Sequence, residues 1–377
     1  MPLTVGVLKE TLKGETRVAL TPEITSKLIK LGVSVVMERG AGEAAQIPDA
    51  DYQGVEITDA SGVLAKAGLL LTVQPAAAET VGKLRSGSTV AGLMYGHINK
   101  ELVNALKKNK VIGFAMELIP RISRAQSMDV LSSQAAAAGY QAALIAATTL
   151  DKFFPMLTTA AGTIRPAQVL VIGAGVAGLQ AIATAKRLGA VVKAYDVRSA
   201  TREQVQSLGA KFVETGVSAE GEGGYARELT DDEKKQQQAA LEKEIAISDV
   251  VISTAAIPGR PAPKIISAEA ARAMKPGAVI VDLAAESGGN CALTKAGETV
   301  VDNKVKIVGP VNLPASLGRH ASDMYARNLY NFISPAIEKG ELKIDWEDEV
   351  FASSVLTRDG EIKHKATKEA VEGGASR

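Results

Sequence analysis

Two stretches of this sequence hold side chains and glycines that are suited to chemistry. The first is a glycine-rich turn with Gly173, Gly175 and Gly178, which follows four apolar residues at 169–172. In a strand–turn–helix unit the first glycine permits the sharp turn, the second lets the backbone approach a pyrophosphate, and the third lets the helix pack closely on the strand. The helix that follows presents free N–H groups and the positive end of its dipole. We therefore predict a dinucleotide-binding site here.

An acid stands where such a site needs one. Asp196 follows a second predicted strand at 190–195, so its carboxylate is placed to accept the hydroxyls of an adenosine ribose. A carboxylate here repels a 2′-phosphate and so favours NAD over NADP, although Arg198, two residues further on, weakens that preference. The alternative is a glycine-rich turn in some other α/β domain.

The second stretch is a polar segment at 117–134, which follows a predicted strand and leads into a predicted helix. Its polar side chains suit one hydrogen-bonded cluster, or else helix capping combined with a surface salt bridge. The four residues concerned are Arg121, Gln126, Asp129 and Ser132.

The reaction decides which groups are needed. A dehydrogenase acting on an alcohol or amine moves a proton as well as a hydride, so it needs a general acid or base near the nicotinamide. His97 and Glu286 are candidates, with Arg17 as an anion clamp. Hydride transfer between two nicotinamide rings needs no such proton; it needs the rings held in near-attack geometry. A polar loop with an amide such as that of Gln126 suffices for this.

The elements around these stretches predict an α/β protein. Apolar runs alternate with helical segments, which is typical of doubly wound parallel sheets. Thr21 and Pro22 predict a helix start with a capping hydroxyl. Predicted strands are 3–8, 33–37, 69–73, 89–93 and 111–114 in the first half, and 169–172, 190–195, 211–213, 249–253, 278–283 and 305–308 in the second; predicted helices include 100–108, 177–188 and 231–247.

Two long helices, at 124–153 and 317–338, are expected to connect two Rossmann-like domains. The first domain takes residues 1–125 and 318–377, and the NAD(H)-binding domain takes 126–317. The tail is expected to form β-structure at 342–346, 350–356 and 361–364, with 365–377 frayed. The cofactor is expected at the carboxyl ends of the second domain's strands, in the cleft between the domains.

Regular patterning breaks down between Glu214 and Thr230, where glycines and acids surround a single aromatic residue, Tyr225. One interpretation is a solvated loop. The other is a lid that closes over bound cofactor, with Tyr225 as its anchor.

Composition excludes several classes of protein. At 377 residues the chain fits about two domains, and its net charge of +1 gives no reason to expect nucleic acid. A single cysteine, Cys291, cannot form an internal disulfide, and we expect no metal site because His and Cys do not cluster. The N-terminus leads directly into a predicted strand, so we expect no signal peptide, and the apolar stretch 135–150 is too short for a membrane span.

Over essentially its full length the chain resembles the soluble NAD(H)-binding component of proton-translocating NAD(P)+ transhydrogenases. The most specific motif is Arg121 to Asp129, which matches the polar loop of the family's hydride-transfer site. The glycine turn, Asp196, Gly224-Tyr225 of the family's mobile loop and the segment 286–290 agree as well. The resemblance implies that Gln126 orients a nicotinamide within a network of Arg121, Asp129 and Ser132. The cofactor-binding residues it implies are Arg121, Ile122, Ser123, Gln126, Ser127, Met128, Asp129, Gly173, Ala174, Gly175, Val176, Gly178, Asp196, Val197, Arg198, Gly224 and Tyr225.

The resemblance also implies partners. It implies a homodimer, a separate component that binds NADP(H), and a membrane component that conducts protons. Hydride would pass directly from NADH to NADP+. The chain would be cytoplasmic, and peripheral on the inner face of the membrane through its partners.

Two other functions stay open. Alanine dehydrogenases share this fold and the region Lys9–Pro22 with Arg17, and His97 resembles their histidine. Their lysine, however, is expected where Gln74 stands, and their aspartate where Glu286 stands. The third possibility is an NAD-sensing module without chemistry.

Overall fold

The computed structural model describes residues 2–216, 230–256 and 260–373. The chain divides into two compact units, Met1–Gln134 with Pro314–Arg377, and Ala135–Leu313. The division therefore falls several residues from the predicted 125/126 and 317/318. The polar segment stays with the first unit because Asn328 and Asn331 donate to the Ser127 carbonyl at 2.8 and 3.0 Å.

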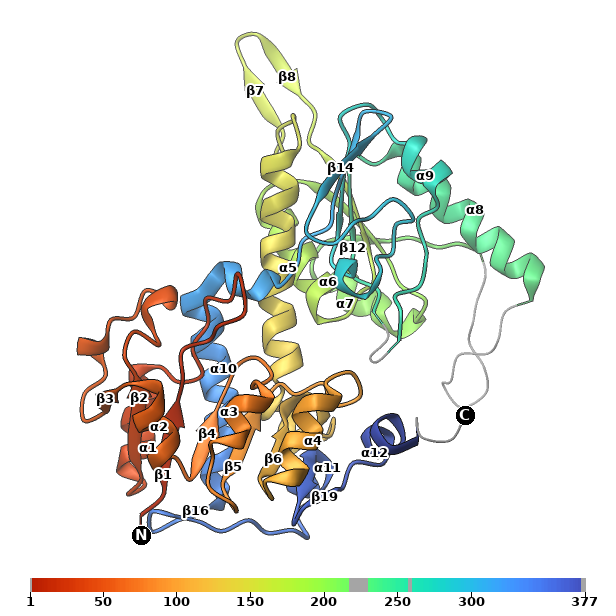
Figure 1. Ribbon diagram of the computed structural model, residues 1–377. Helices are drawn as coiled ribbons and strands as arrows, with labels where there is room; N and C mark the ends of the chain where they lie inside the picture. The colour runs from red at the N-terminus through yellow and green to blue at the C-terminus, as the bar shows by residue number, and fades with distance from the viewer. Residues whose placement is uncertain (1, 217–229, 257–259, 374–377) are drawn as a thin grey trace. The chain divides into compact units, whose positions relative to one another are not determined.

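The first unit is built on an eight-stranded sheet (Figure 1), as the alternation of strands and helices predicts. Six strands are parallel, with a change of direction in strand order between β1 and β4. Two antiparallel strands extend the sheet beyond β6. In spatial order the strands are β19 (Glu361–Ile362), β18 (Val355–Arg358), β6 (Ile112–Ala115), β5 (Thr89–Gly92), β4 (Leu69–Leu71), β1 (Thr4–Val7), β2 (Ser34–Glu38) and β3 (Glu56–Thr58).

Helices cover both faces of this sheet. Successive residues of each strand serve opposite faces, so that Leu69 and Leu71 join one apolar core and Leu70 the other. The first core includes side chains from α1 (Pro22–Lys30), α10 (Gly318–Ile333) and α11 (Glu349–Ser354). The second includes those from α2 (Ala60–Lys66), α3 (Ala78–Gly82), α4 (Lys100–Lys108) and α12 (Lys365–Glu372).

The second unit repeats this plan with seven strands. All are parallel except β14 at the edge. The order is β11 (Lys211–Phe212), β10 (Val191–Tyr195), β9 (Gln168–Ile172), β12 (Val250–Ser253), β13 (Val279–Asp282), β15 (Val305–Val308) and β14 (Thr299–Asp302). One face packs on α5 (Val130–Thr149), α6 (Val176–Arg187) and α7 (Arg202–Ser207), and the other on α8 (Asp231–Ile247) and α9 (Ala268–Arg272). The predicted pair of doubly wound Rossmann-like sheets is thus confirmed.

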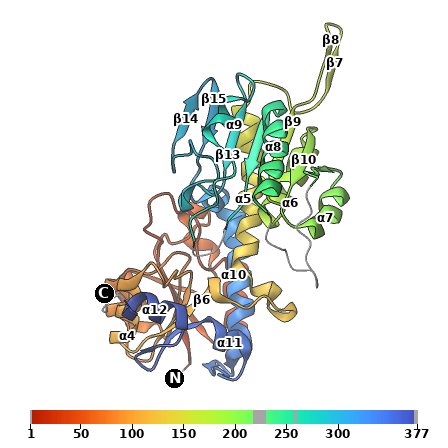
Figure 2. The same ribbon diagram turned by 90° about the vertical axis from the view of Figure 1, so that its right-hand side faces the viewer.

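Both long connecting helices are shorter than predicted. The helix expected at 124–153 begins at Val130, because Asp129 is extended and its carboxylate accepts the Ser132 N–H at 2.9 Å. The helix expected at 317–338 ends at Ile333, where the chain passes into a short 3-10 helix, Ser334–Ala336. Pro335 in that turn has no backbone N–H and so cannot continue the α-helical hydrogen bonding. After α5 the chain forms an unpredicted hairpin, β7 (Leu157–Thr159) and β8 (Gly162–Ile164), which projects from the second unit in Figure 2.

The tail also differs from the prediction. Most of the strand expected at 350–356 is helix α11, because Asp348 caps its first turn by accepting the Val350 N–H at 2.8 Å. The strand expected at 342–346 shrinks to a short ladder of β16 (Ile337–Glu338) with β17 (Glu341–Leu342). Residues expected to fray form α12, capped by the ring of His364. At α1 the predicted cap is wrong, since the Thr21 side chain makes no capping hydrogen bond.

Candidate functional site

The glycine turn of the second unit joins β9 to α6 at the point where strand order changes direction, between β9 and β12. Ligands of open parallel sheets bind at such points, beyond the carboxyl ends of the strands. Gly173 has φ +94°, and an added Cβ would lie 2.6 Å from Thr254 Oγ1. A Cβ on Gly178 would lie 1.8 Å from the Gly173 carbonyl oxygen. Both positions therefore need glycine for the fold itself.

Gly175 differs from its two neighbours. A Cβ added there would meet no atom of the described residues within 4 Å, and its φ of −77° is accessible to any residue. The fold therefore does not require glycine at this position. The bare backbone leaves open space beside the N-terminus of α6, which fits a pyrophosphate approaching the N–H groups of that helix.

Asp196, at the end of β10, is buried beside this turn. Its Oδ2 accepts the Ala174 N–H at 2.7 Å and its Oδ1 the Arg198 N–H at 2.9 Å, while Arg198 also pairs with it through the guanidinium. Burial alone would raise the pKa of Asp196, but hydrogen bonds from the Arg198 side chain and the two N–H groups outweigh it and lower that pKa. The carboxylate is thus ionised, as a ribose acceptor must be.

Two buried residues, Asp282 and Asn290, fix the segment after β13; Asn290 lies within the segment 286–290 noted from the sequence, whereas Asp282 was not marked there. Asp282 accepts the Cys291 N–H at 2.9 Å and the Thr294 hydroxyl at 2.6 Å. Asn290 accepts the Ala255 N–H at 3.1 Å and donates to the Ala255 and Pro263 carbonyls. They hold the turn at 284–291, leaving Glu286 exposed on it. For Asp282 the available signal was its position at the end of a strand; for Asn290 it was its place in the segment 286–290, which agrees with the transhydrogenase family.

In the first unit the structure brings together only some of the predicted polar cluster. Ser132 donates from its hydroxyl to Asp129 Oδ2 at 2.6 Å, and its N–H bonds to Oδ1 of the same carboxylate. Arg121 and Gln126 are exposed. The Asp129 N–H donates to the Gln126 backbone carbonyl at 3.3 Å, but among the described residues no side-chain hydrogen bond joins Arg121 or Gln126 to the Asp129–Ser132 pair. The Asp129–Ser132 contact is the capping geometry that the sequence left open as the alternative.

The loop before this cap is nevertheless well anchored. The buried side chains of Ala125 and Met128 flank Gln126 in a short 3-10 helix, Ser123–Met128. Arg124 forms a two-pronged ion pair with Asp348. Gln126 thus has an exposed amide on a fixed backbone, which suits contact with a ligand. Ile122 is partly buried, and Ser123 and Ser127 are exposed.

The first unit has a polar cluster at its own change of strand direction, between β1 and β4. Glu10 accepts the Val73 and Gln74 N–H groups at 2.6 and 3.3 Å, and Gln74 donates to Glu15 at 2.7 Å. Arg17 pairs with Glu15 and also donates to Gln134. Burial raises the pKa of Glu10 to about 7. Of these residues only Arg17 and Gln74 were singled out from the sequence; Glu10 and Glu15 lie within the region Lys9–Pro22, and Gln134 ends the polar segment, but no local pattern distinguished them.

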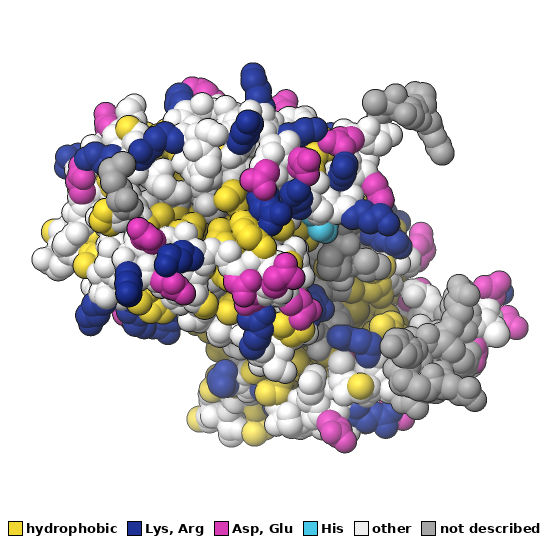
Figure 3. Space-filling model, turned by 90° about the horizontal axis from the view of Figure 1, so that it is seen from below, with side chains coloured by type: hydrophobic (Ala, Val, Ile, Leu, Met, Phe, Trp, Pro, Cys, Tyr) yellow, Lys and Arg dark blue, Asp and Glu magenta, His cyan; other side chains and the backbone are white. Residues whose placement is uncertain are grey.

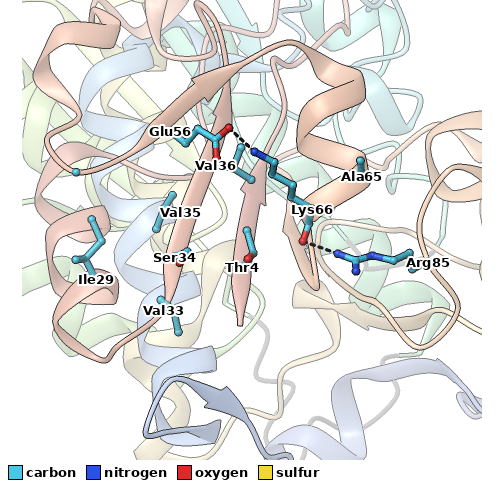
Figure 4. Close-up of a pocket in the computed structure, with 11 residues that line it drawn as sticks. Thr4, Ile29, Val33, Ser34, Val35, Val36, Glu56, Ala65, Lys66 and Arg85 are labelled. Carbon is cyan, nitrogen blue, oxygen red and sulfur yellow. Dashed lines mark hydrogen bonds and ion pairs between the residues drawn. The ribbon is translucent and has the colours of Figure 1, made fainter. Parts of the chain in front are cut away.

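Basic and acidic side chains are interspersed on the face shown in Figure 3, so no strongly charged patch marks a site there. Two pockets lie elsewhere in the units. One, of about 590 Å³, opens at the amino ends of β1 and β2 and is lined by Glu56, Lys66 and Arg85 among others (Figure 4). The other, of about 840 Å³, lies by the amino ends of β9 and β12, where Lys152 and Lys275 pair with Asp249. Parallel sheets bind ligands at the opposite, carboxyl ends, so pocket size does not mark the site either.

The remaining predictions concern residues outside these clusters. Gly224 and Tyr225 lie outside the described residues, so the lid prediction is untested. His97 is exposed on the turn between β5 and α4. The described residues include no His, Cys, Asp or Glu group that could hold a metal ion, and none of the described helices is long and apolar enough to cross a bilayer.

Comparison with known proteins covers nearly the whole chain. The family models described as alanine dehydrogenase/PNT, N-terminal and C-terminal domains, match residues 6–138 and 142–365. The polypeptide that forms the first portion of NAD(P) transhydrogenase subunit alpha in Rhodospirillum rubrum is 47% identical over 97% of this chain and 98% of its own length. The crystal structure of a transhydrogenase from Sinorhizobium meliloti superposes with a TM-score of 0.88 at 44% identity, covering 95% of this chain and 99% of that one. An L-alanine dehydrogenase structure shares the fold, with a TM-score of 0.81 at 21% identity over 98% and 99% of the two chains.

Proposed function

Because this chain belongs to the alanine dehydrogenase/PNT family, whose transhydrogenases bind NAD(H), we propose that it is the NAD(H)-binding subunit of a proton-translocating NAD(P)+ transhydrogenase. The observation that carries the proposal is the full-length similarity to transhydrogenase alpha subunits. The open backbone at Gly175 and the ionised, buried carboxylate of Asp196 support it, since together they provide for a pyrophosphate and a ribose.

Each group of this chain then has a limited task, because bound NADH itself supplies the hydride. The N–H groups of α6 hold the pyrophosphate and Asp196 holds the adenosine ribose. The amide of Gln126 orients the nicotinamide, and the Asp129–Ser132 cap fixes the backbone from which Gln126 extends. No general acid is needed, because transfer between nicotinamide rings moves no proton at the reacting carbons.

The partners follow from the same proposal. A separate component holds NADP+ as the hydride acceptor, and a membrane component couples the transfer to proton movement and keeps this chain at the inner membrane face. We also propose a homodimer. The hairpin β7–β8 supports it, since all residues of its two strands are exposed, including the apolar Leu157 and Ile164, and exposed Met156 precedes it. Mass measurement in solution tests this: a monomer at micromolar concentration would contradict it.

Alanine dehydrogenase activity is disfavoured by the cluster in the first unit. Gln74 stands where that family's lysine is expected, and an amide does not transfer protons as an amine does. Arg17 is already bound by Glu15 and Gln134, which leaves less of its guanidinium for a substrate carboxylate.

One set of assays separates the three functions. NADH binding to the purified chain is followed by fluorescence, and pyruvate with ammonium is then added. Turnover there would indicate an alanine dehydrogenase and contradict the proposal. Next the NADP(H)-binding component is added with thio-NADP+, whose reduced form absorbs separately from NADH. We expect hydride transfer only in this mixture; tight NADH binding without transfer in the assembled complex would indicate a sensing module.

A further inference from the structure

The carboxylate of Asp196 is fully occupied by the chain's own donors. A carboxylate has about four acceptor positions. Two backbone N–H groups, those of Ala174 and Arg198, take one position on each oxygen at 2.7 and 2.9 Å. The Arg198 guanidinium takes the other two, from Nε to Oδ1 and from Nη2 to Oδ2, both at 2.9 Å. An adenosine ribose therefore finds no free acceptor on Asp196.

The four donors differ in how readily they leave. The two N–H groups are fixed by the glycine turn and by the backbone after β10. The Arg198 side chain is 58% exposed, whereas that of Asp196 is 5% exposed. Water can solvate the exposed guanidinium when it leaves, and ligand hydroxyls can then donate to the buried carboxylate in its place. The guanidinium thus supplies the only two of these four hydrogen bonds that a ligand can displace without moving the backbone.

On the basis of the ribose placement proposed above, we propose that Arg198 is a specificity-determining residue that competes with the adenosine ribose for Asp196. The 2′- and 3′-hydroxyls of NAD(H) must replace Nε and Nη2, so the guanidinium lowers the affinity for NAD(H). Once displaced, it lies next to the 2′ position, where it pairs with a 2′-phosphate. Arg198 therefore reduces the preference for NAD(H) over NADP(H) in two ways: it lowers the affinity for NAD(H) and raises the affinity for NADP(H).

A neighbouring arginine provides the matched control. Arg202 has comparable exposure and lies four residues further along the chain, but it pairs with Glu214 at 3.2 Å and stacks over the Phe212 ring. Arg202→Ala removes the same charge close to the subsite without touching Asp196. A difference in nucleotide affinity between the two variants is then due to the contact with Asp196 and not to the change in net charge.

The test uses the whole chain with NADH, NADPH and the fragments 5′-AMP and 2′,5′-ADP, which lack the nicotinamide. For Arg198→Ala we expect the Kd of NADH and 5′-AMP to fall about two- to fivefold, as for loss of an exposed competing pair. The Kd of NADPH and 2′,5′-ADP should rise about tenfold, as for loss of a charge-assisted contact. The gain for NADH should shrink at high salt. Arg202→Ala should change each Kd by less than about twofold.

Weaker or unchanged NADH binding by Arg198→Ala would overturn the proposal, because Arg198 would then hold Asp196 in place or have no role in binding. Thermal unfolding of both arginine variants checks that they fold alike. Asp196→Ala tests the placement of the ribose separately. If that variant bound NADH like the wild type, the placement itself would fail, whatever the arginine variants showed.

Discussion

Arg17 donates two hydrogen bonds to one carboxylate, from Nε to Glu15 Oε1 at 2.8 Å and from Nη2 to Oε2 at 2.6 Å. Both side chains are buried in the first unit. Gln134 accepts from Arg17 at 2.9 Å, and Gln74 donates to Glu15 at 2.7 Å, so amides replace water around the pair. Removing one partner would leave the other charge buried and uncompensated.

We expect Arg17→Met to lower the free energy of unfolding of the first unit by about 3–5 kcal/mol, the usual cost of breaking a buried ion pair. The double variant Glu15→Met/Arg17→Met should recover much of this loss, because neither charge is then stranded. Urea unfolding of the wild type, both single variants and the double variant measures the coupling. A double variant no more stable than Arg17→Met would contradict it.

Glu10 should make stability depend on pH in the sense opposite to an ordinary paired carboxylate. Its pKa is about 7 in the folded chain against an ordinary 4.5, so the folded state binds the proton more tightly. The contribution of Glu10 to stability is then greatest below pH 4.5 and falls as pH rises towards 7, by at most about 3 kcal/mol. Glu10→Gln should remove this loss. Equal pH profiles of the wild type and variant between about pH 5 and 8 would show that Glu10 titrates normally.

Glu15 should make stability depend on pH in the opposite sense to Glu10. Burial alone would raise its pKa, but hydrogen bonds from Arg17 and Gln74 outweigh this and lower it to about 2. The stabilisation is complete above the ordinary pKa of 4.5 and is lost as pH falls from there towards 2. Acid unfolding should therefore begin at a higher pH in Gln74→Ala, which lacks one of these donors, than in the wild type. An unchanged acid midpoint would mean that Gln74 does not contribute.

Two glycines of the turn, Gly175 and Gly178, should separate folding from binding. Gly175→Ala adds a methyl group in open space, so the free energy of unfolding should change by less than about 1 kcal/mol. The same methyl group meets the pyrophosphate, so NADH binding should weaken about tenfold or more. Gly178→Ala places Cβ against a backbone oxygen and should lower stability by about 1–3 kcal/mol. Unimpaired NADH binding by Gly175→Ala would place the pyrophosphate elsewhere.

Substitutions at Asp129 and Gln126 should likewise distinguish a loss of stability from a loss of hydride transfer. Asp129→Ala removes a helix cap and should lower stability by about 1 kcal/mol, whereas Asp129→Asn keeps a capping oxygen. Gln126→Ala alters an exposed side chain, so stability should stay within about 0.5 kcal/mol while hydride transfer to the NADP(H)-binding component falls. Gln53→Ala, at an exposed turn of the same unit, is the control. Transfer at the wild-type rate in Gln126→Ala would leave the loop a purely structural element.

Local signals predicted much of the fold. The bounds of α4 and α8 coincide with the predicted 100–108 and 231–247. Thr230 and Glu233 form a capping box at the start of α8, and α4 has an acid in its first turn and two lysines in its last. The prediction failed where a tertiary contact overrides the local pattern. The apolar residues at 350–356 suit a strand, but Val350 and Phe351 pack into the first core as one helical turn capped by Asp348.

Local sequence patterns are enough to define the chemical groups available to this chain: a glycine turn followed by an acid at the end of the next strand, and a polar loop with Gln126. Such patterns arise from backbone conformation and hydrogen bonds between residues only a few positions apart in the chain. The partners of these groups were decided by the folded arrangement of the chain. It paired Asp196 with Arg198, left the Gln126 side chain exposed beside the Asp129–Ser132 cap, and gathered Glu10, Glu15 and Arg17 where β1 and β4 end. Such contacts depend on which strands become neighbours and on burial, and no single stretch of sequence encodes either.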